Sequence, residues 1–115
     1  HTPCDIESKA LEFDLADFGI IGLETLFASL NTFTELSLDD ILPKITTVPR
    51  QILQLAIPNI EVGAVANLTV FDTTTEWKYL PENVQSKSNN SPFLNQKLKG
   101  KVKLVVHQGR IISYD

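Results

Sequence analysis

Hydrophobic and polar residues follow a helical period in the first half of the chain. From Leu23 to Leu30, apolar residues recur at the i, i+3, i+4 and i+7 positions of an amphipathic helix, which we expect to end near Asn31 or Thr32. Before this helix, residues 7–17 alternate apolar and acidic positions without a period, and we expect a loop or a single helical turn there. Residues 1–6 resemble the end of a buried strand that turns into a loop.

Two shorter helices are expected between residues 37 and 58. Ser37 followed by Asp40 is a capping-box-like start, and Pro43 inside the apolar pattern predicts a short or kinked helix. Thr47 is expected to cap the next helix, with Pro49 in its first turn, where a missing N–H group does no harm. The residues of this helix expected to face inward are Ile52, Leu53 and Leu55.

After Pro58 the period changes from 3.6 to two, which predicts strands. We expect them at 67–72, 76–80 and 101–106, and the third should form a hairpin with 110–114 through Gln108 and Gly109, the glycine taking a positive φ. The polar stretch 81–96 is expected to be a loop. Four short strands with no covering helix of their own form a marginal unit, so strands from elsewhere in a larger protein are expected to complete it.

Length and composition limit the interpretation further. A chain of 115 residues with 43% hydrophobic content fits one domain, and it contains no apolar run of the ~18 residues that a membrane span needs. It begins with His1 and has no methionine, so we expect a processed chain or a fragment. The single cysteine, Cys4, excludes an internal disulfide and fits a reducing cytosol.

Charge is distributed unevenly along the chain. Residues 1–40 carry nine acids against one lysine, whereas residues 41–115 sum to +4. Lysines alternate at positions 97, 99, 101 and 103, and this series fits either a nucleic-acid patch or a solvated strand face. We favour the solvated face and expect no nucleic-acid partner.

The candidate reactive residues do not form a complete catalytic set. His1 and His107 are the only histidines, too few for a metal site clustered in sequence, and we interpret His107 as structural. Gly19 and Gly22 fit either an anion-binding helix N-terminus or, as we favour, a tight turn. HExxH, P-loop, GxSxG and CxxC motifs are absent, so the residues alone name no enzyme.

Five stretches of the chain are nevertheless familiar. HTPCDIESKALEFDLADFGIIGLETLF resembles the segment after the eighth barrel strand of dihydroorotases, in the metal-dependent amidohydrolase superfamily, which reads Asp-His-x-Pro-His, an EEKA-like stretch and FGIIGLET. TVPRQI resembles the family's TxNPARI helix, and VGAVANLTVFD its VGxxADLVVFD strand. SKSNNSPF resembles its SKSxNTPF loop, and GKV…HQGRII its GxV…NGRIV ending.

This resemblance implies an α/β fold, namely the C-terminal fragment of a TIM (β/α)8 barrel hydrolase followed by strands of a small β-sandwich domain. Residues 1–58 would be the last barrel loops and helices, and residues 59–115 the sandwich strands. The implied function is that of a zinc-dependent dihydroorotase, which reversibly cyclises N-carbamoyl-L-aspartate to dihydroorotate in cytoplasmic pyrimidine biosynthesis. The implied partners are this small-molecule substrate and the missing N-terminal part of the same protein, with a homo-oligomer left open and no membrane.

The resemblance also assigns residues. No catalytic or metal-binding residue is expected in this chain, because the family's aspartate would stand immediately before His1 and its two zinc ions on upstream residues. The substrate-binding positions would be Cys4, in place of a histidine, with Phe18 and Gly19, which follow Asp17 where the family has proline. We expect the fragment alone to be inactive. Two alternatives stay open: a non-catalytic dihydroorotase-like assembly subunit, motivated by Cys4, and another cyclic amidohydrolase of the hydantoinase or allantoinase type.

Overall fold

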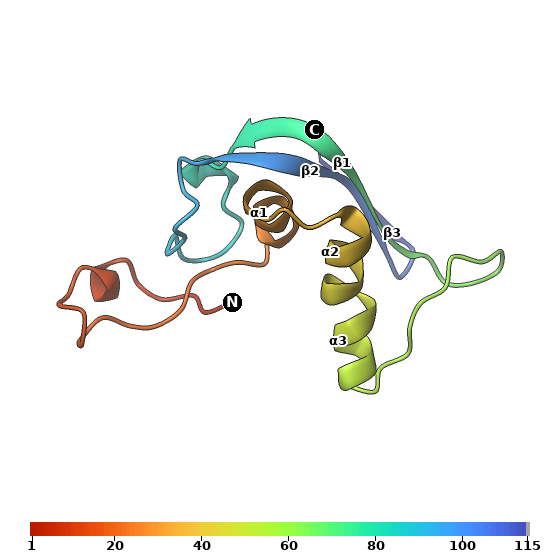
Figure 1. Cartoon of the computed structure of the whole chain (residues 1–115), viewed down its shortest axis with the longest axis horizontal. Coiled ribbons are helices and arrows are strands. Elements are labelled where there is room, and N and C mark those ends of the chain that lie inside the picture. Colours follow the sequence, from red (N-terminus) through yellow and green to blue (C-terminus); the bar gives the residue numbers. More distant parts are fainter. Residues whose placement is uncertain (115) are drawn as a thin grey trace.

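The chain folds around a three-stranded antiparallel sheet in the order β1-β2-β3, shown in Figure 1 by a computed structural model that describes residues 1–114. The strands are β1 (Asn67–Lys78), β2 (Lys97–His107) and β3 (Arg110–Ser113). The helices are α1 (Leu26–Phe33), α2 (Leu38–Ile45) and α3 (Thr47–Ile52), with short 3-10 turns at Glu7–Lys9 and Pro81–Asn83. Helix α1 lies under the sheet, and α2 and α3 lead away from it (Figure 1).

The sheet confirms the period of two but corrects the number of strands. The predicted strands 67–72 and 76–80 are one strand, β1, whose pairing with β2 shifts register between Asp72 and Glu76. Strand β2 begins at Lys97, four residues before the predicted start. The hairpin into β3 is confirmed, and both Gln108 and Gly109 have positive φ, as a two-residue turn of type I′ requires.

Helix α1 covers one face of this sheet, which corrects the expectation that the strands have no covering helix. The Asn31 side-chain amide donates to the carbonyl oxygens of Thr73, at 3.0 Å, and of Lys99, at 2.8 Å. The Thr32 hydroxyl accepts from the Lys99 backbone N–H at 2.7 Å. These bonds lie where the ladder between β1 and β2 is interrupted, so helix side chains satisfy backbone groups that a regular ladder would have paired.

The helix prediction for the residues before Asn31 is confirmed in kind, wrong in its start and right for only part of its apolar face. Helix α1 begins at Leu26 rather than Leu23, and Leu23 is 68% exposed. Leu26 is exposed too, whereas Phe27 and Leu30 are half-buried and the Phe27 ring packs against Phe71 of β1, with 4.3 Å between the ring centroids. Thr25, before the helix, and Ala28 are fully buried. A small core forms there, in which Ala28, Tyr79 and Leu98 are buried and Trp77, Val84, Phe93 and Leu94 pack against them.

Helices α2 and α3 follow the sequence prediction to different degrees. The capping box of Ser37 and Asp40 is confirmed, and Pro43 lies inside α2. The cap of α3 is Thr46 rather than Thr47. The prediction that its apolar residues face inward is wrong, because Ile52 is 75% exposed and the following leucines, Leu53 and Leu55, are exposed too. Helix α3 leads away from the sheet (Figure 1), and these three apolar side chains stay exposed within residues 1–114.

The first residues form no strand, which corrects the prediction for residues 1–6. They pair with no strand among residues 1–114. Hydrogen bonds attach them to the rest of the chain, one of them from Thr2 N to the Ile20 carbonyl at 2.7 Å. The predicted single turn is confirmed as the 3-10 turn Glu7–Lys9.

None of the helices within residues 1–114 has the length and apolarity needed to cross a membrane.

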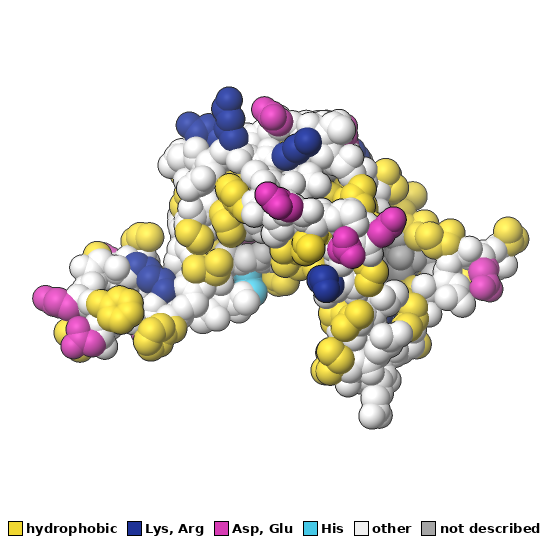
Figure 2. Space-filling model, in the orientation of Figure 1, with side chains coloured by type: hydrophobic (Ala, Val, Ile, Leu, Met, Phe, Trp, Pro, Cys, Tyr) yellow, Lys and Arg dark blue, Asp and Glu magenta, His cyan; other side chains and the backbone are white. Residues whose placement is uncertain are grey.

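Alternation along the first half of β2 agrees with a solvated strand face. Lys97 and Lys99 are exposed, whereas Leu98 and Gly100 between them are buried towards α1. Figure 2 shows basic side chains on the sheet side of the molecule, interspersed with acidic ones.

Candidate functional site

Asn90 connects the loop before β2 to the first residues of the chain. Its side chain is 4% exposed, and its Nδ2 donates to the Thr2 carbonyl at 2.8 Å and lies 2.9 Å from the Cys4 sulfur. Its Oδ1 accepts from the Cys4 backbone N–H at 3.3 Å and from the Ser88 hydroxyl at 2.6 Å. Both donor hydrogens and both acceptor positions of the amide are therefore in use.

A second segment, residues 17–21, joins the same cluster. The Ile21 N–H donates to the Asn90 carbonyl at 3.3 Å, and Asn90 Nδ2 also lies 3.5 Å from the Gly19 carbonyl oxygen. The ammonium group of Lys9 donates to the Gly19 carbonyl at 2.7 Å and to the carbonyl of Asp17. Three segments far apart in sequence thus meet around one buried amide.

Gly19 permits this close approach. Its φ is +98°, in the region that favours glycine, and a Cβ atom built on it would lie 2.5 Å from Thr2 Cβ. Any side chain would push Thr2 away from residue 19. The glycine that the sequence resemblance places at the substrate is therefore also required by the backbone.

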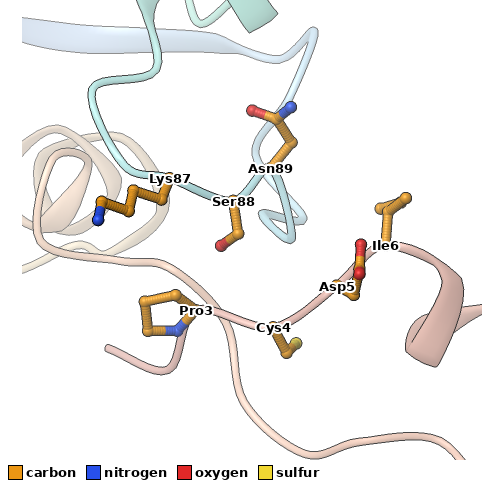
Figure 3. A pocket seen from close by; sticks show the side chains of 7 residues that line it. All are labelled: Pro3, Cys4, Asp5, Ile6, Lys87, Ser88 and Asn89. Carbon is orange, nitrogen blue, oxygen red and sulfur yellow. The ribbon is translucent and has the colours of Figure 1, made fainter.

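Beside this cluster lies a cavity of about 470 Å³, lined by residues 3–6 on one side and 87–89 on the other (Figure 3). The Lys87 side chain extends from the loop on the same side as Pro3, and the Asp5 carboxylate stands on the facing segment. Cys4 is half-buried in the wall. The cavity thus combines one basic and one acidic side chain with hydroxyl and amide groups, which suits a small polar ligand.

The three sequence-predicted site residues are only partly brought together. Cys4 and Gly19 both contact Asn90, so one side chain links them. The Phe18 side chain is 82% exposed and does not line the cavity. Asp17, where the family has proline, contributes its carbonyl to the bond from Lys9.

Glu24 is a second connecting residue, which sequence reasoning quoted within a motif but gave no role. Its carboxylate accepts from the Tyr79 hydroxyl at 3.2 Å, from Gln85 N at 2.9 Å and from Ser86 N at 2.7 Å. Burial, together with the neighbouring Glu24 carboxylate, raises the pKa of Tyr79 to about 12. Glu24, two residues before α1, therefore holds the beginning of the loop that contains Asn90.

The N–H group of Gly22, the second glycine before α1, is not free for an anion. The His1 Nδ1 atom accepts from Gly22 N at 3.1 Å and from Leu23 N at 3.4 Å. The His1 ring therefore occupies the position where the anion-binding interpretation would place a ligand. The buried Thr25 hydroxyl, two residues after Leu23, has no hydrogen-bond partner within residues 1–114.

Residues 1–114 contain no group of three or more His, Cys, Asp or Glu side chains that would hold a metal ion. His107, at the end of β2, lines a different cavity, with Arg50 and the loop after α3.

Comparison with known proteins identifies what these segments resemble. No family model matches the chain. Over 97% of its length it is 38% identical to a protein from Endomicrobium trichonymphae and 37% identical to one from Citrifermentans bemidjiense, and over 96% it is 39% identical to one from Ehrlichia canis. All three relatives belong to one class of protein. Each of them is a dihydroorotase, which confirms the resemblance along almost the whole chain. The chain spans about a quarter of the length of these curated relatives.

Proposed function

We propose that the chain is the C-terminal part of a zinc-dependent dihydroorotase, which interconverts N-carbamoyl-L-aspartate and dihydroorotate in pyrimidine biosynthesis in the cytoplasm. The observation that carries the proposal is the identity of 37–39% to dihydroorotases over 96–97% of the chain. Because the chain spans about a quarter of these relatives, the activity belongs to the larger protein.

The proposal divides the chain into two parts. Residues 1–58 would be the last loops and helices of a TIM (β/α)8 barrel, and residues 59–115 would be the closing strands of a β-sandwich domain. The exposed apolar face that begins at Ile52 supports this division, since helices at the rim of a barrel are covered by their neighbours. The short antiparallel sheet supports the second part, because three strands alone make an incomplete sandwich.

We assign substrate binding to Cys4, Phe18 and Gly19. The backbone of Phe18 and Gly19 would contact the amide edge of the dihydroorotate ring, and Cys4 would line the part of the site that receives the substrate carboxylate. Support comes from the hydrogen bonds that hold the Cys4 and Gly19 backbones in one cluster, beside a polar cavity of about 470 Å³. Preorganised backbone groups of this kind bind and orient a ligand at little cost in entropy.

The zinc ions of the proposed enzyme do not fit residues 1–114, which bring no three metal-binding side chains together. We therefore assign the metal ligands and the catalytic aspartate to residues outside this chain, the aspartate directly before His1. The roles proposed for this chain are confined to binding and orienting the substrate.

The test is an assay of the full-length protein that contains this chain. Dihydroorotate should be hydrolysed, with hydantoin and allantoin turned over at least ~100-fold less efficiently, a discrimination typical of sites that hydrogen-bond their substrate. Turnover of hydantoin or allantoin in preference to dihydroorotate would contradict the proposal. A folded full-length protein that hydrolyses none of the three would also contradict it and would indicate a non-catalytic subunit.

The 115-residue chain alone provides a control for that assay. We expect it to show no turnover and to bind no zinc, because its described residues lack a ligand set. Stoichiometric zinc in the purified chain, measured by atomic absorption, would contradict the assignment of the metal to upstream residues.

A further inference from the structure

We propose that Asn90 is the positioning residue of a wall formed by residues 1–4 and 17–21, which would face the substrate. Its side-chain amide fixes the backbone of Cys4 and Gly19 in the geometry that binds substrate. The identity of the substrate rests on the proposed function, whereas the positioning itself rests on the contacts of residues 1–114.

The first argument is burial. Asn90 and Thr25 are the only buried polar residues of the described chain, and Thr25 leaves its hydroxyl without a partner. Every polar atom of the Asn90 side chain, in contrast, is bonded. A buried amide that is fully satisfied holds its neighbours firmly, because each broken bond would leave a polar group buried without a partner.

The second argument is that little apolar packing holds residues 1–4 and 17–20 in place. Residues 17–21 form neither helix nor strand, and Phe18 and Ile20 are exposed, so Ile21, which is 2% exposed, is the one buried apolar side chain of this segment. Residues 1–4 are likewise irregular, with only Cys4 half-buried. Since residues 1–3 and 17–20 bury no apolar side chain, the hydrogen bonds to Asn90, from Thr2 to Ile20 and from Lys9 set their positions, with Ile21 packed at the end of the second segment.

The third argument is that Asn90 itself is held in place. Glu24 binds the N–H groups of Gln85 and Ser86 at the beginning of the loop, and Ser88 donates to the Asn90 side chain. The loop is therefore fixed before it reaches the cavity. A positioning residue must itself be held rigidly, because a mobile side chain could not fix the backbone that it contacts.

The chemistry of the amide explains why asparagine is needed. Aspartate has the same shape but no donor, so Asn90→Asp would place a carboxylate against the Thr2 and Gly19 carbonyl oxygens. Asn59→Asp is the matched control, because Asn59 is exposed, lies in the loop after α3 and carries no hydrogen bond within residues 1–114.

The experiment uses the full-length protein with both variants. In N90D we expect the KM for dihydroorotate to rise about 10-fold or more with kcat changed less than about 3-fold, because substrate-binding geometry is lost. Hydrogen exchange at the amides of Cys4 and Ile21 should accelerate about 10-fold or more while the amides of β2 keep their rates. N59D should leave both readouts at the wild-type values.

Three outcomes would overturn the positioning role. These are unchanged exchange at Cys4 and Ile21, faster exchange spread equally over β2, and a loss of kcat at constant KM. If N90D does not fold, Asn90→Ser provides the same test without the added charge. If the wild-type protein does not hydrolyse dihydroorotate, the proposed function fails, and the exchange measurement alone decides whether Asn90 positions the wall.

Discussion

The Glu24 carboxylate accepts a hydrogen bond from the Ser86 backbone N–H at 2.7 Å, across 62 positions of sequence. Glu24 belongs to the GLET stretch and Ser86 opens the SKSNNSPF stretch, two of the motifs that resemble dihydroorotases. The HTPC stretch joins them through Asn90, which is part of the same loop. Motifs that are separate in sequence therefore form one hydrogen-bonded unit.

Removing the Glu24 carboxylate should loosen that unit. We expect Glu24→Ala to lower the free energy of unfolding by about 2 kcal/mol, since three donors lose a charged acceptor, and Glu24→Gln to lower it by about half as much. Urea unfolding followed by the fluorescence of Trp77, the only tryptophan, measures both. Glu82→Ala is the control, and equal effects of E24A and E82A would contradict the role of Glu24.

Asn31 should contribute more to the stability of the fold than its place on the short helix α1 indicates. Asn31→Leu removes the donor to the carbonyls of Thr73 and Lys99, so both lose a partner at the break in the ladder. We expect a loss of about 2–3 kcal/mol in the free energy of unfolding, measured by the same urea titration. Ser29→Ala, which removes only a bond within α1, should cost less than about 1 kcal/mol, and a comparable loss would refute the argument.

The period of the apolar residues predicted which segments form helices and strands, but not where these elements continue or what covers them. Alternation indicated strands on both sides of Asp72 but could not show that β1 continues through the irregular stretch. Within that stretch Asn31, 42 residues upstream, binds the Thr73 carbonyl, a contact that periodicity does not show. Periodicity likewise shows that α3 has an apolar face at Ile52 but not whether anything covers it.

The candidate site was predictable where a motif matched and not where a contact crosses the chain. Resemblance pointed to Cys4, Phe18 and Gly19, of which Cys4 and Gly19 lie together in the structure. Asn90 and Glu24 lie inside quoted motifs, so their positions were visible in the sequence. Apart from Ser88, the partners of their side chains lie 55 to 88 positions away, and only the folded chain shows them.

Asp72 makes the stability of the sheet depend on pH. The backbone N–H of Thr74, and then the hydroxyls of Thr74 and Thr75 and the Thr75 N–H, hold the pKa of the Asp72 carboxyl well below its ordinary value. A carboxylate with a lowered folded-state pKa stabilises the protein above the unfolded pKa, about 3.9, and loses this contribution as the pH falls further.

This dependence can be measured by comparing wild type with Asp72→Asn. At pH 7 the variant should unfold at lower urea concentration, and the difference between the two midpoints should shrink steadily as the pH falls below about 4. Asp14→Asn, at an exposed loop position, should show no such trend. A midpoint difference that stays constant down to pH 2 would show that the Asp72 carboxylate does not stabilise the fold through its charge.

Gly19→Ala should damage the wall more than the same change at the hairpin. Both glycines have positive φ, +98° at Gly19 and +77° at Gly109, so each substitution carries backbone strain of about 1 kcal/mol. A Cβ at residue 19 would also lie 2.5 Å from Thr2 Cβ, whereas one at residue 109 meets nothing within 4 Å.

The additional contact at residue 19 must displace Thr2 and the neighbouring Cys4, whose backbone Asn90 holds. We expect G19A to lower the free energy of unfolding by about 2–4 kcal/mol in total and G109A by about 1 kcal/mol. Alkylation of the Cys4 thiol should also accelerate in G19A and stay unchanged in G109A, because only the first variant moves residues 2–4. Equal losses of stability with equal Cys4 reactivity would show that the approach of Thr2 to Gly19 does not hold the wall together.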